Sequence, residues 1–406
     1  MRTDSEKPVI VIALITAVCL LGDTMLYIVL PIYWKSFGLT SLWQVGVLLS
    51  INRFVRLPLN PFVGWLYHRI SKRTGVLIAV GLAGITTCSY GYSSGFWLLF
   101  FSRCLWGVAW AFLRLGGFLT VLQVADQHNR GFLIGKYNGL WGLGGLIGML
   151  AGGILADVIG IEAVTLIFGA AALLSIPFVI RYIPNNFIDN KKRVESGIGA
   201  YKQVWKQKSM IPVMISGLLM SMVFFGIYMS TLSRLIELNY SESFRLFGIV
   251  FGSATLAGLI QAIRWSWDPF LAPRFGQLSD QHSGRTSFLI TALFLGALCF
   301  VILPFKIPLI VWFIVLLFLQ LTWTMIVTIT DSFATDVASK SYKVAIMTTY
   351  TVVVDLGAAI GPALGYMLSE IFNISVLYWL TGSLLFSLGV FLRFNNVYET
   401  RQTKQN

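Results

Sequence analysis

The sequence predicts an all-α integral membrane protein in which twelve transmembrane helices form two pseudo-symmetric six-helix bundles. Of the 406 residues, 56% are hydrophobic and only 12% are charged, which is too little charge to cover a soluble domain of this size. Apolar runs of about 18 or more residues recur along the chain, and a run of that length can span a bilayer as a helix. The two halves of the chain also repeat one another.

The predicted helices follow these apolar runs in order. The first run is longer than the apolar core of a signal peptide, and no small-residue cleavage site follows it, so we expect it to stay in the membrane. The longest polar stretch, 184–209, leaves six helices on each side, and its part 197–208 is interpreted either as an amphipathic surface helix or as a solvated linker. The domains are therefore predicted at 1–183, 184–209 and 210–406. The helices are expected at 8–31, 41–66, 76–93, 96–122, 134–158, 162–183, 210–236, 244–270, 286–303, 308–330, 344–370 and 374–394.

The distribution of lysine and arginine along the chain indicates which loops face the cytoplasm. The formal net charge is +13, and a cytoplasmic N-terminus places 21 of the 30 lysines and arginines in cytoplasmic segments. This positive-inside pattern predicts a multi-pass protein of the cell membrane with both termini cytoplasmic. We assign the charge to topology and lipid headgroups, and expect no nucleic-acid partner. The opposite face holds Lys35, Arg234, Arg245 and Lys306.

Ionisable residues within the predicted helices are the first candidates for a functional site. Arg53 and Arg56 share one face of the second helix and have no acid within a turn, so we expect a partner from another helix, with Asp23 the best candidate. One guanidinium would then remain to meet an anionic group of a substrate; the alternative is a purely structural pair. Arg264 and Asp268 are four residues apart and are expected to pair locally. The full set is Asp23, Arg53, Arg56, Arg103, Arg114, Arg264, Asp268 and Asp355.

The sequence contains no motif that predicts a cofactor site or an enzyme active site. The three histidines fall in loops without metal-site spacing, and the four cysteines lie in apolar runs, where we expect free buried thiols. The chain has no phosphate-binding glycine loop and no catalytic cluster. We therefore expect neither an enzyme nor a bound cofactor or metal, and a proton gradient as the source of energy.

Two sequence patterns recur in both halves. The loop after the second helix, GWLYHRISKRTG (64–75), matches GQLSDQHSGRT (276–286) after the eighth. Rows of glycine also recur, as GGLIGMLAGG (144–153) in the fifth helix and GAAIGPALG (357–365) in the eleventh. Small residues let helices approach closely in a bilayer, and repeated halves are typical of transporters with a midplane site.

These patterns resemble the motifs of the major facilitator superfamily over essentially the whole chain. RCLWGVAWA is similar to the fourth-helix motif, GDTMLYIVLP to the first-helix motif, and the glycine row of the fifth helix to the antiporter motif. Two departures stand out: His68 replaces the acid of the loop motif, and Met149 replaces the proline of the fifth-helix motif. The matching residues are Asp23, Thr24, Pro31, Gly64, Arg73, Arg103, Gly107, Ala111, Gly144, Gly148, Gly152, Gly153, Gly276, Asp280 and Arg285.

The resemblance implies alternating access, with the two halves rocking about a cavity lined by the first, fourth, seventh and tenth helices. It implies that Asp23, beside the fixed cation Arg103, couples transport to protons, with Asp355 as the alternative acid. It also implies that the protein is a monomer. Predicted substrate-binding residues are Arg53, Arg56, Arg114, Trp110, Phe225, Tyr228 and Trp323. Predicted gating residues are Gly64, Arg69, Arg73, Gly276, Asp280 and Arg285 in the loops, and Gly144, Gly148, Gly152, Gly361 and Pro362 in the helices that slide or open.

Three functional interpretations follow. The first is a proton-coupled exporter of a small anionic or zwitterionic amphipathic metabolite, such as a carboxylate-rich metal chelator (metallophore export), because arginine dominates the membrane-embedded charge. The alternative is a multidrug/proton antiporter for lipophilic compounds. The third, a membrane-embedded enzyme or sensor, is disfavoured by the repeated halves and by the lack of a catalytic cluster.

Overall fold

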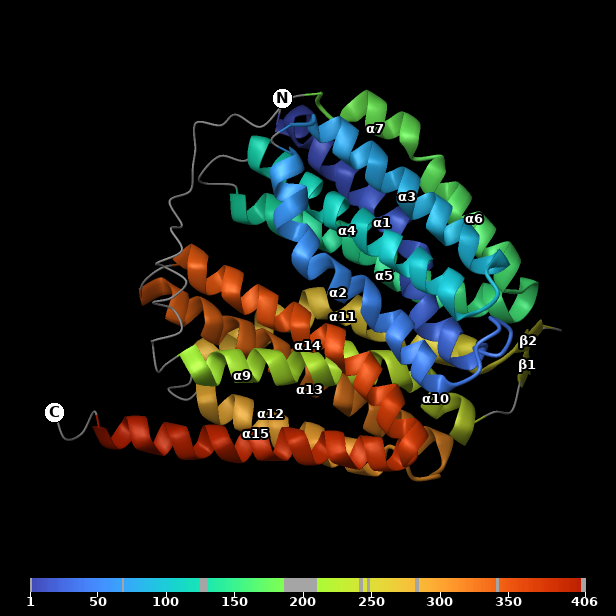
Figure 1. Ribbon diagram of the computed structural model, residues 1–406. Coiled ribbons are helices and arrows are strands. Elements are labelled where there is room, and N and C mark those ends of the chain that lie inside the picture. The colour runs from blue at the N-terminus through green and yellow to red at the C-terminus, as the bar shows by residue number, and fades with distance from the viewer. Residues whose placement is uncertain are drawn as a thin grey trace. The chain divides into compact units, whose positions relative to one another are not determined.

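The computed structural model (Figure 1) describes residues 2–67, 69–124, 130–185, 210–240, 244–246, 249–281, 285–340 and 343–402. The predicted linker 184–209 lies almost wholly outside these residues. Within the described helices, nothing is assigned to the side chains of Arg264, Asp280 and Arg285.

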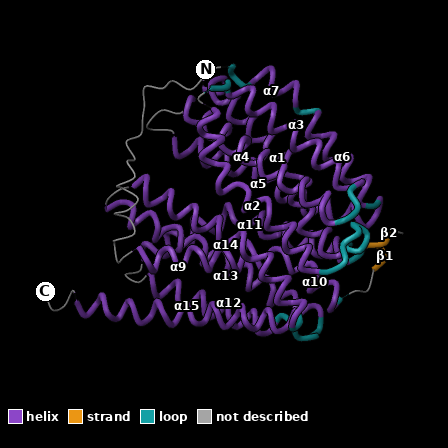
Figure 2. Tube along the Cα trace, viewed as in Figure 1, coloured by secondary structure: helices purple, strands orange, loops and turns teal. Residues whose placement is uncertain are grey.

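The described chain consists of helices, one short strand pair and the loops that connect them (Figure 2). The first half comprises α1 (Arg2–Ile32), α2 (Leu42–Tyr67), α3 (Lys72–Tyr92), α4 (Phe96–Val124), α5 (Arg130–Ile159), α6 (Ile161–Leu173) and α7 (Ile176–Tyr182). The second comprises α9 (Met210–Met220), the π-helix η1 (Ser221–Tyr228), α10 (Met229–Asn239), β1 (Phe244–Leu246), β2 (Ile249–Phe251), α11 (Ser253–Gln281), α12 (Arg285–Ile302), α13 (Leu309–Lys340), α14 (Lys343–Ile371) and α15 (Ile374–Gln402).

The predicted fold class is confirmed. Among the described residues, nine helical spans are long and apolar enough to cross a membrane, with α6–α7 forming one span and α9–η1–α10 another. The charge-bearing helices α2 and α11 and the shorter α12 complete the twelve predicted crossings. The sixth crossing is interrupted at Leu174–Ser175, just before Pro177, which has no backbone N–H to continue the helix.

One predicted helix, 244–270, was wrong at both ends. Residues 244–246 and 249–251 form an antiparallel strand pair, with Phe244 opposite Phe251, and the helix begins only at Ser253 and continues to Gln281. A short apolar run fits either a buried strand or a helix, so hydrophobicity alone did not separate the two. The third helix begins earlier than predicted, at Lys72, because the Ser71 side chain accepts a hydrogen bond from the Thr74 backbone N–H.

The contacts divide the chain into two compact units. Unit 1 comprises 1–193 and 229–266, and unit 2 comprises 194–228 and 267–406. Within unit 1, α1 packs along α5, α3 along α6, and α4 along α2; within unit 2, α14 packs along η1 and α12 along α15. The division at 183 and 210 stays a prediction.

Glycine sets the closest helix contacts in each unit. A Cβ added at Gly144, Gly148 or Gly152 of α5 would overlap α1, at Ala17, Leu21 and Met25 respectively. In unit 2, Gly361 of α14 lies against Gly226 of η1. The glycines of the helices that were expected to slide or open therefore lie at contacts within one unit. Gly153 lets α5 pack closely against Ala254 of α11.

Candidate functional site

A buried ion pair joins α1 and α4 in unit 1. Arg103 Nη1 donates to Asp23 Oδ1, and the two side chains expose only 1% and 12% of their surface. Asn52 Nδ2 of α2 donates to the same carboxylate oxygen over 3.2 Å, and Arg103 Nε donates to the Leu48 carbonyl over 2.9 Å. Three helices thus converge on one carboxylate within the membrane-spanning segment.

The fourth-helix motif explains how α2 reaches this pair. A Cβ at Gly107 would lie 2.6 Å from the carbonyl oxygen of Asn52, so only glycine lets the two backbones approach this closely. Gly107 is one turn from Arg103, which places the guanidinium beside the α2 backbone. A buried charge of this kind is tolerated because it is both paired and hydrogen-bonded.

The arginines of α2 are not the partners of Asp23, which corrects the expected pairing. The Arg53 guanidinium carbon lies 5.9 Å from the centroid of the Tyr27 ring, and that of Arg56 lies 6.0 Å from the Trp110 ring. Both arginines are half-buried. Among the residues that the structure describes, Arg53 has no ion-pair partner, and its guanidinium lies against the Tyr27 ring.

A row of tryptophans extends from Arg56 across unit 1. Trp110 of α4 contacts Trp106 at a centroid distance of 6.4 Å and Trp141 of α5 at 5.5 Å, and Trp141 contacts Trp265 of α11 at 6.4 Å. The indole nitrogen of Trp110 is buried without a hydrogen-bond partner in the described part of the chain. Half-buried Arg114 follows Trp110 by one turn of α4.

The predicted aromatic residues of the seventh and tenth helices meet in unit 2. Trp323 contacts Phe225 at a centroid distance of 5.3 Å and Tyr228 at 5.5 Å, with Phe224 stacked on it at 5.4 Å. Trp323 and Tyr228 are fully buried, so neither ring offers surface to a ligand in this conformation. Their role in substrate binding stays a prediction.

The other predicted site residues are distributed over both units. Arg69 stacks on Trp65 at 4.2 Å, and Arg73 Nε donates over 2.9 Å to the carbonyl of Ile183, after α7. Gly64 has only the Leu115 side chain near its Cβ position, at 3.9 Å. Asp355, Gly361 and Pro362 lie on α14 in unit 2, with Asp355 half-buried. Gly276 and Asp280 lie on α11 and Arg285 on α12, and the structure does not describe their surroundings.

Sequence reasoning missed two residues that the structure brings into the argument. Asn52 precedes Arg53 in the sequence, and its polar side chain in the middle of an apolar helix could have indicated a contact with the buried charges. Asp157, near the C-terminal end of α5, accepts from Tyr33 Oη over 2.5 Å and from the backbone and side chain of Thr255. Its signal was weak, because acids near helix ends are usually solvated.

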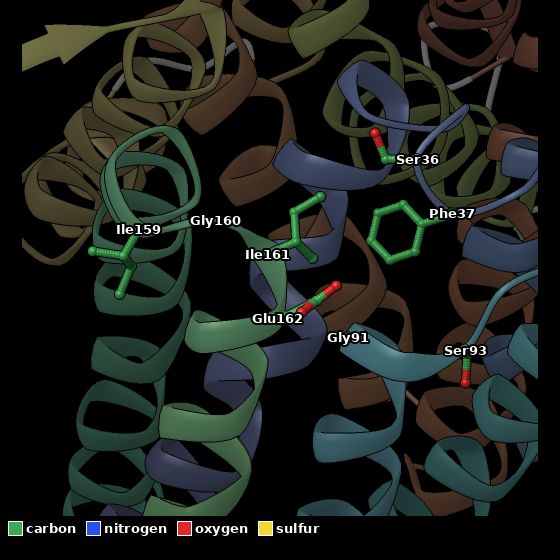
Figure 3. Close-up of a pocket in the computed structure, with 8 residues that line it drawn as sticks. All are labelled: Ser36, Phe37, Gly91, Ser93, Ile159, Gly160, Ile161 and Glu162. Carbon is green, nitrogen blue, oxygen red and sulfur yellow. The ribbon is translucent and has the colours of Figure 1, made fainter.

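A pocket of about 290 Å³ lies at the C-terminal end of α5, where Ile159 lines it (Figure 3). None of the predicted substrate-binding or proton-coupling residues lines it. Within the described residues no cluster of histidine, cysteine or acidic side chains has the arrangement of a metal site. The pocket is lined by Ser36, Phe37, Gly91, Ser93, Ile159, Gly160, Ile161 and Glu162.

Comparisons with known proteins agree with this architecture. The family model of the Major Facilitator Superfamily matches residues 12–268 and 269–406. The chain is 26% identical over 286 residues to the multidrug resistance protein MdtG of Salmonella paratyphi B, covering 68% of this chain and 67% of that protein. A bacterial homologue of the human lysosomal transporter Spinster superposes with a TM-score of 0.74, at 15% identity over 96% of this chain and 95% of that one. A POT family transporter in complex with a thioalcohol-conjugated peptide gives 0.75, at 11% identity over 97% and 96%.

Proposed function

The chain belongs to the Major Facilitator Superfamily and is a membrane transporter, and on that premise we propose that it is a proton-coupled exporter of small anionic or zwitterionic amphipathic molecules. It resides in the cell membrane with both termini cytoplasmic and works by alternating access. The observation that carries the proposal is the pairing of Asp23 with Arg103, which leaves the charge of Arg53 against an aromatic ring.

Proton coupling is assigned to Asp23. Arg103 is a permanent cation, and its guanidinium is paired with the Asp23 carboxylate. If substrate or helix movement separates the pair, a desolvated carboxylate without its cation takes up a proton. Asn52 Nδ2 donates to the same carboxylate oxygen that Arg103 contacts. Asp355 in unit 2 is the second candidate for this role.

The substrate class follows from charge and aromatic surface. Arg53 lies over Tyr27 and Arg56 over Trp110, at the start of the tryptophan row of α4, α5 and α11. A guanidinium bordered by aromatic faces binds a carboxylate or phosphate whose remainder is apolar and flat. A carboxylate-rich metal chelator with aromatic groups has this chemistry.

A multidrug/proton antiporter is the second candidate, and one observation favours it. The relatives that share 26% identity carry the name multidrug resistance protein. The tryptophan row also offers the flat apolar surface that lipophilic compounds need. The positive charge of the α2 arginines disfavours lipophilic cations as substrates.

Ligand-dependent thermal unfolding of the purified protein separates the two candidates. We expect aromatic mono- and dicarboxylates to stabilise the wild type, by about 2.7 kcal/mol at 100 times the dissociation constant. Arg53→Gln removes the stabilisation, whereas Arg181→Gln retains it, because Arg181 makes a similar contact with Tyr182 on the exposed end of α7. Stabilisation by lipophilic cations that Arg53→Gln leaves unchanged would instead establish the multidrug interpretation.

A further inference from the structure

The carboxylate of Asp157 collects four hydrogen bonds at one end of unit 1. Oδ1 accepts from Tyr33 Oη over 2.5 Å. Oδ2 accepts from the backbone N–H groups of Gly252 and Thr255, each over 2.9 Å, and from Thr255 Oγ1 over 2.6 Å. One side chain of α5 is therefore bonded to the residue after α1 and to the start of α11.

Asp157 supplies the N-terminal cap that α11 lacks. The residue preceding α11 is Gly252, which has no side chain to accept the first free N–H groups of the helix. A Cβ at Gly252 would lie 3.1 Å from Asp157 Oδ1, so glycine also leaves room for the carboxylate of α5. The cap is thus provided by another crossing.

The same two helices are held in close contact just beyond the cap. A Cβ at Gly153 would overlap the carbonyl of Ala254, and one at Gly258 would overlap the carbonyl of Met149. Tyr33 stays a donor, because burial and the hydrogen bond to Asp157 raise its pKa above the usual range. Ser233 of α10 is buried, and its Oγ donates over 3.3 Å to the Tyr27 carbonyl of α1, the helix that ends just before Tyr33.

We propose that Asp157 is a gating residue: it latches α5 to the N-terminus of α11 and holds this end of the transporter closed. The inference rests on the alternating-access part of the proposed function, since the latch has a role only if α11 leaves α5 during the cycle. When this end opens, α11 loses its cap and Tyr33 loses its acceptor. The hydrogen bonds of Asp157 to α11 and to Tyr33 therefore stabilise the conformation that is closed at this end.

Thiol accessibility tests the latch without any transport measurement. The four native cysteines, Cys19, Cys88, Cys104 and Cys299, are replaced by alanine, and Ser233→Cys is introduced as the reporter. A membrane-impermeant maleimide is added to whole cells and, separately, to inverted vesicles. The latch variant is Asp157→Ala, and the matched control is Glu162→Ala, which removes an exposed acid five residues further along the chain.

We expect Asp157→Ala to accelerate labelling of Cys at position 233 by about five- to thirtyfold, while Glu162→Ala leaves it unchanged. Adding Gly252→Ser to Asp157→Ala restores a local cap to α11 but not the bond to α5, so labelling stays fast. Unchanged labelling in a folded Asp157→Ala protein would overturn the proposal. Slow labelling in the double variant would show that the carboxylate is only a helix cap. The labelling rate depends on neither substrate binding nor proton coupling. A result that contradicts the proposed substrate or coupling residue therefore leaves the test of the latch valid, and the reverse also holds.

Discussion

At the scale of single residues, Asp23 and Arg103 depend on each other. Removing one partner of a buried pair leaves an uncompensated charge, which costs about 3–5 kcal/mol, whereas removing both leaves none. We therefore expect Asp23→Asn and Arg103→Gln each to destabilise the protein, and the double variant to be more stable than the sum of the single effects predicts. Unfolding free energies in a double-mutant cycle measure this coupling. Additive effects would mean that the two charges do not interact in solution.

The sequence located these residues, and the resemblance placed Arg103 beside Asp23, as the structure does; the expected pairing of Asp23 with the arginines of α2 was wrong. Asp23, Arg103 and the arginines of α2 were all recognised as membrane-embedded charges, because a charge inside an apolar run is visible in the sequence. Their pairing depends on which face of each helix meets its neighbour. That face is set by Gly107, whose contact with the Asn52 backbone brings α4 beside α2. A contact between residues 80 positions apart cannot be read from helical spacing.

At the scale of helices, close packing relies on particular glycines. Gly107→Ala places a Cβ 2.6 Å from a backbone oxygen, so α2 and α4 must move apart. We expect a loss of about 1–3 kcal/mol in unfolding free energy and weaker proton-driven transport, because the Asn52 and Arg103 contacts are displaced. Gly81→Ala in α3 is the matched control, since nothing lies within 4 Å of its Cβ position. It should be neutral or stabilising, as alanine favours a helix over glycine. Equal effects of both substitutions would contradict the packing argument.

The helices themselves were predicted better than the ends that join them. Long apolar runs gave the crossings, and the glycine rows gave α5 and α14 as closely packed helices. The start of α11 was missed because its cap comes from Asp157, a residue of another crossing, and the preceding apolar segment folds as β1 and β2. The π-helical turn η1 was also not anticipated, since its sequence has the same apolar character as the helices on either side.

At the scale of the whole molecule, proton coupling and substrate exchange are separable. With Asp23→Asn, residue 23 is permanently neutral, so a proton gradient can no longer drive a net cycle, while a loaded carrier can still exchange substrate across the membrane. We expect proteoliposomes of this variant to lose pH-driven flux at least about tenfold and to retain counterflow. Wild-type proteoliposomes with the same lipid and protein content give the reference, and Asp355→Asn tests the second candidate. Full pH-driven flux in Asp23→Asn with loss in Asp355→Asn would move the titrating site from unit 1 to unit 2.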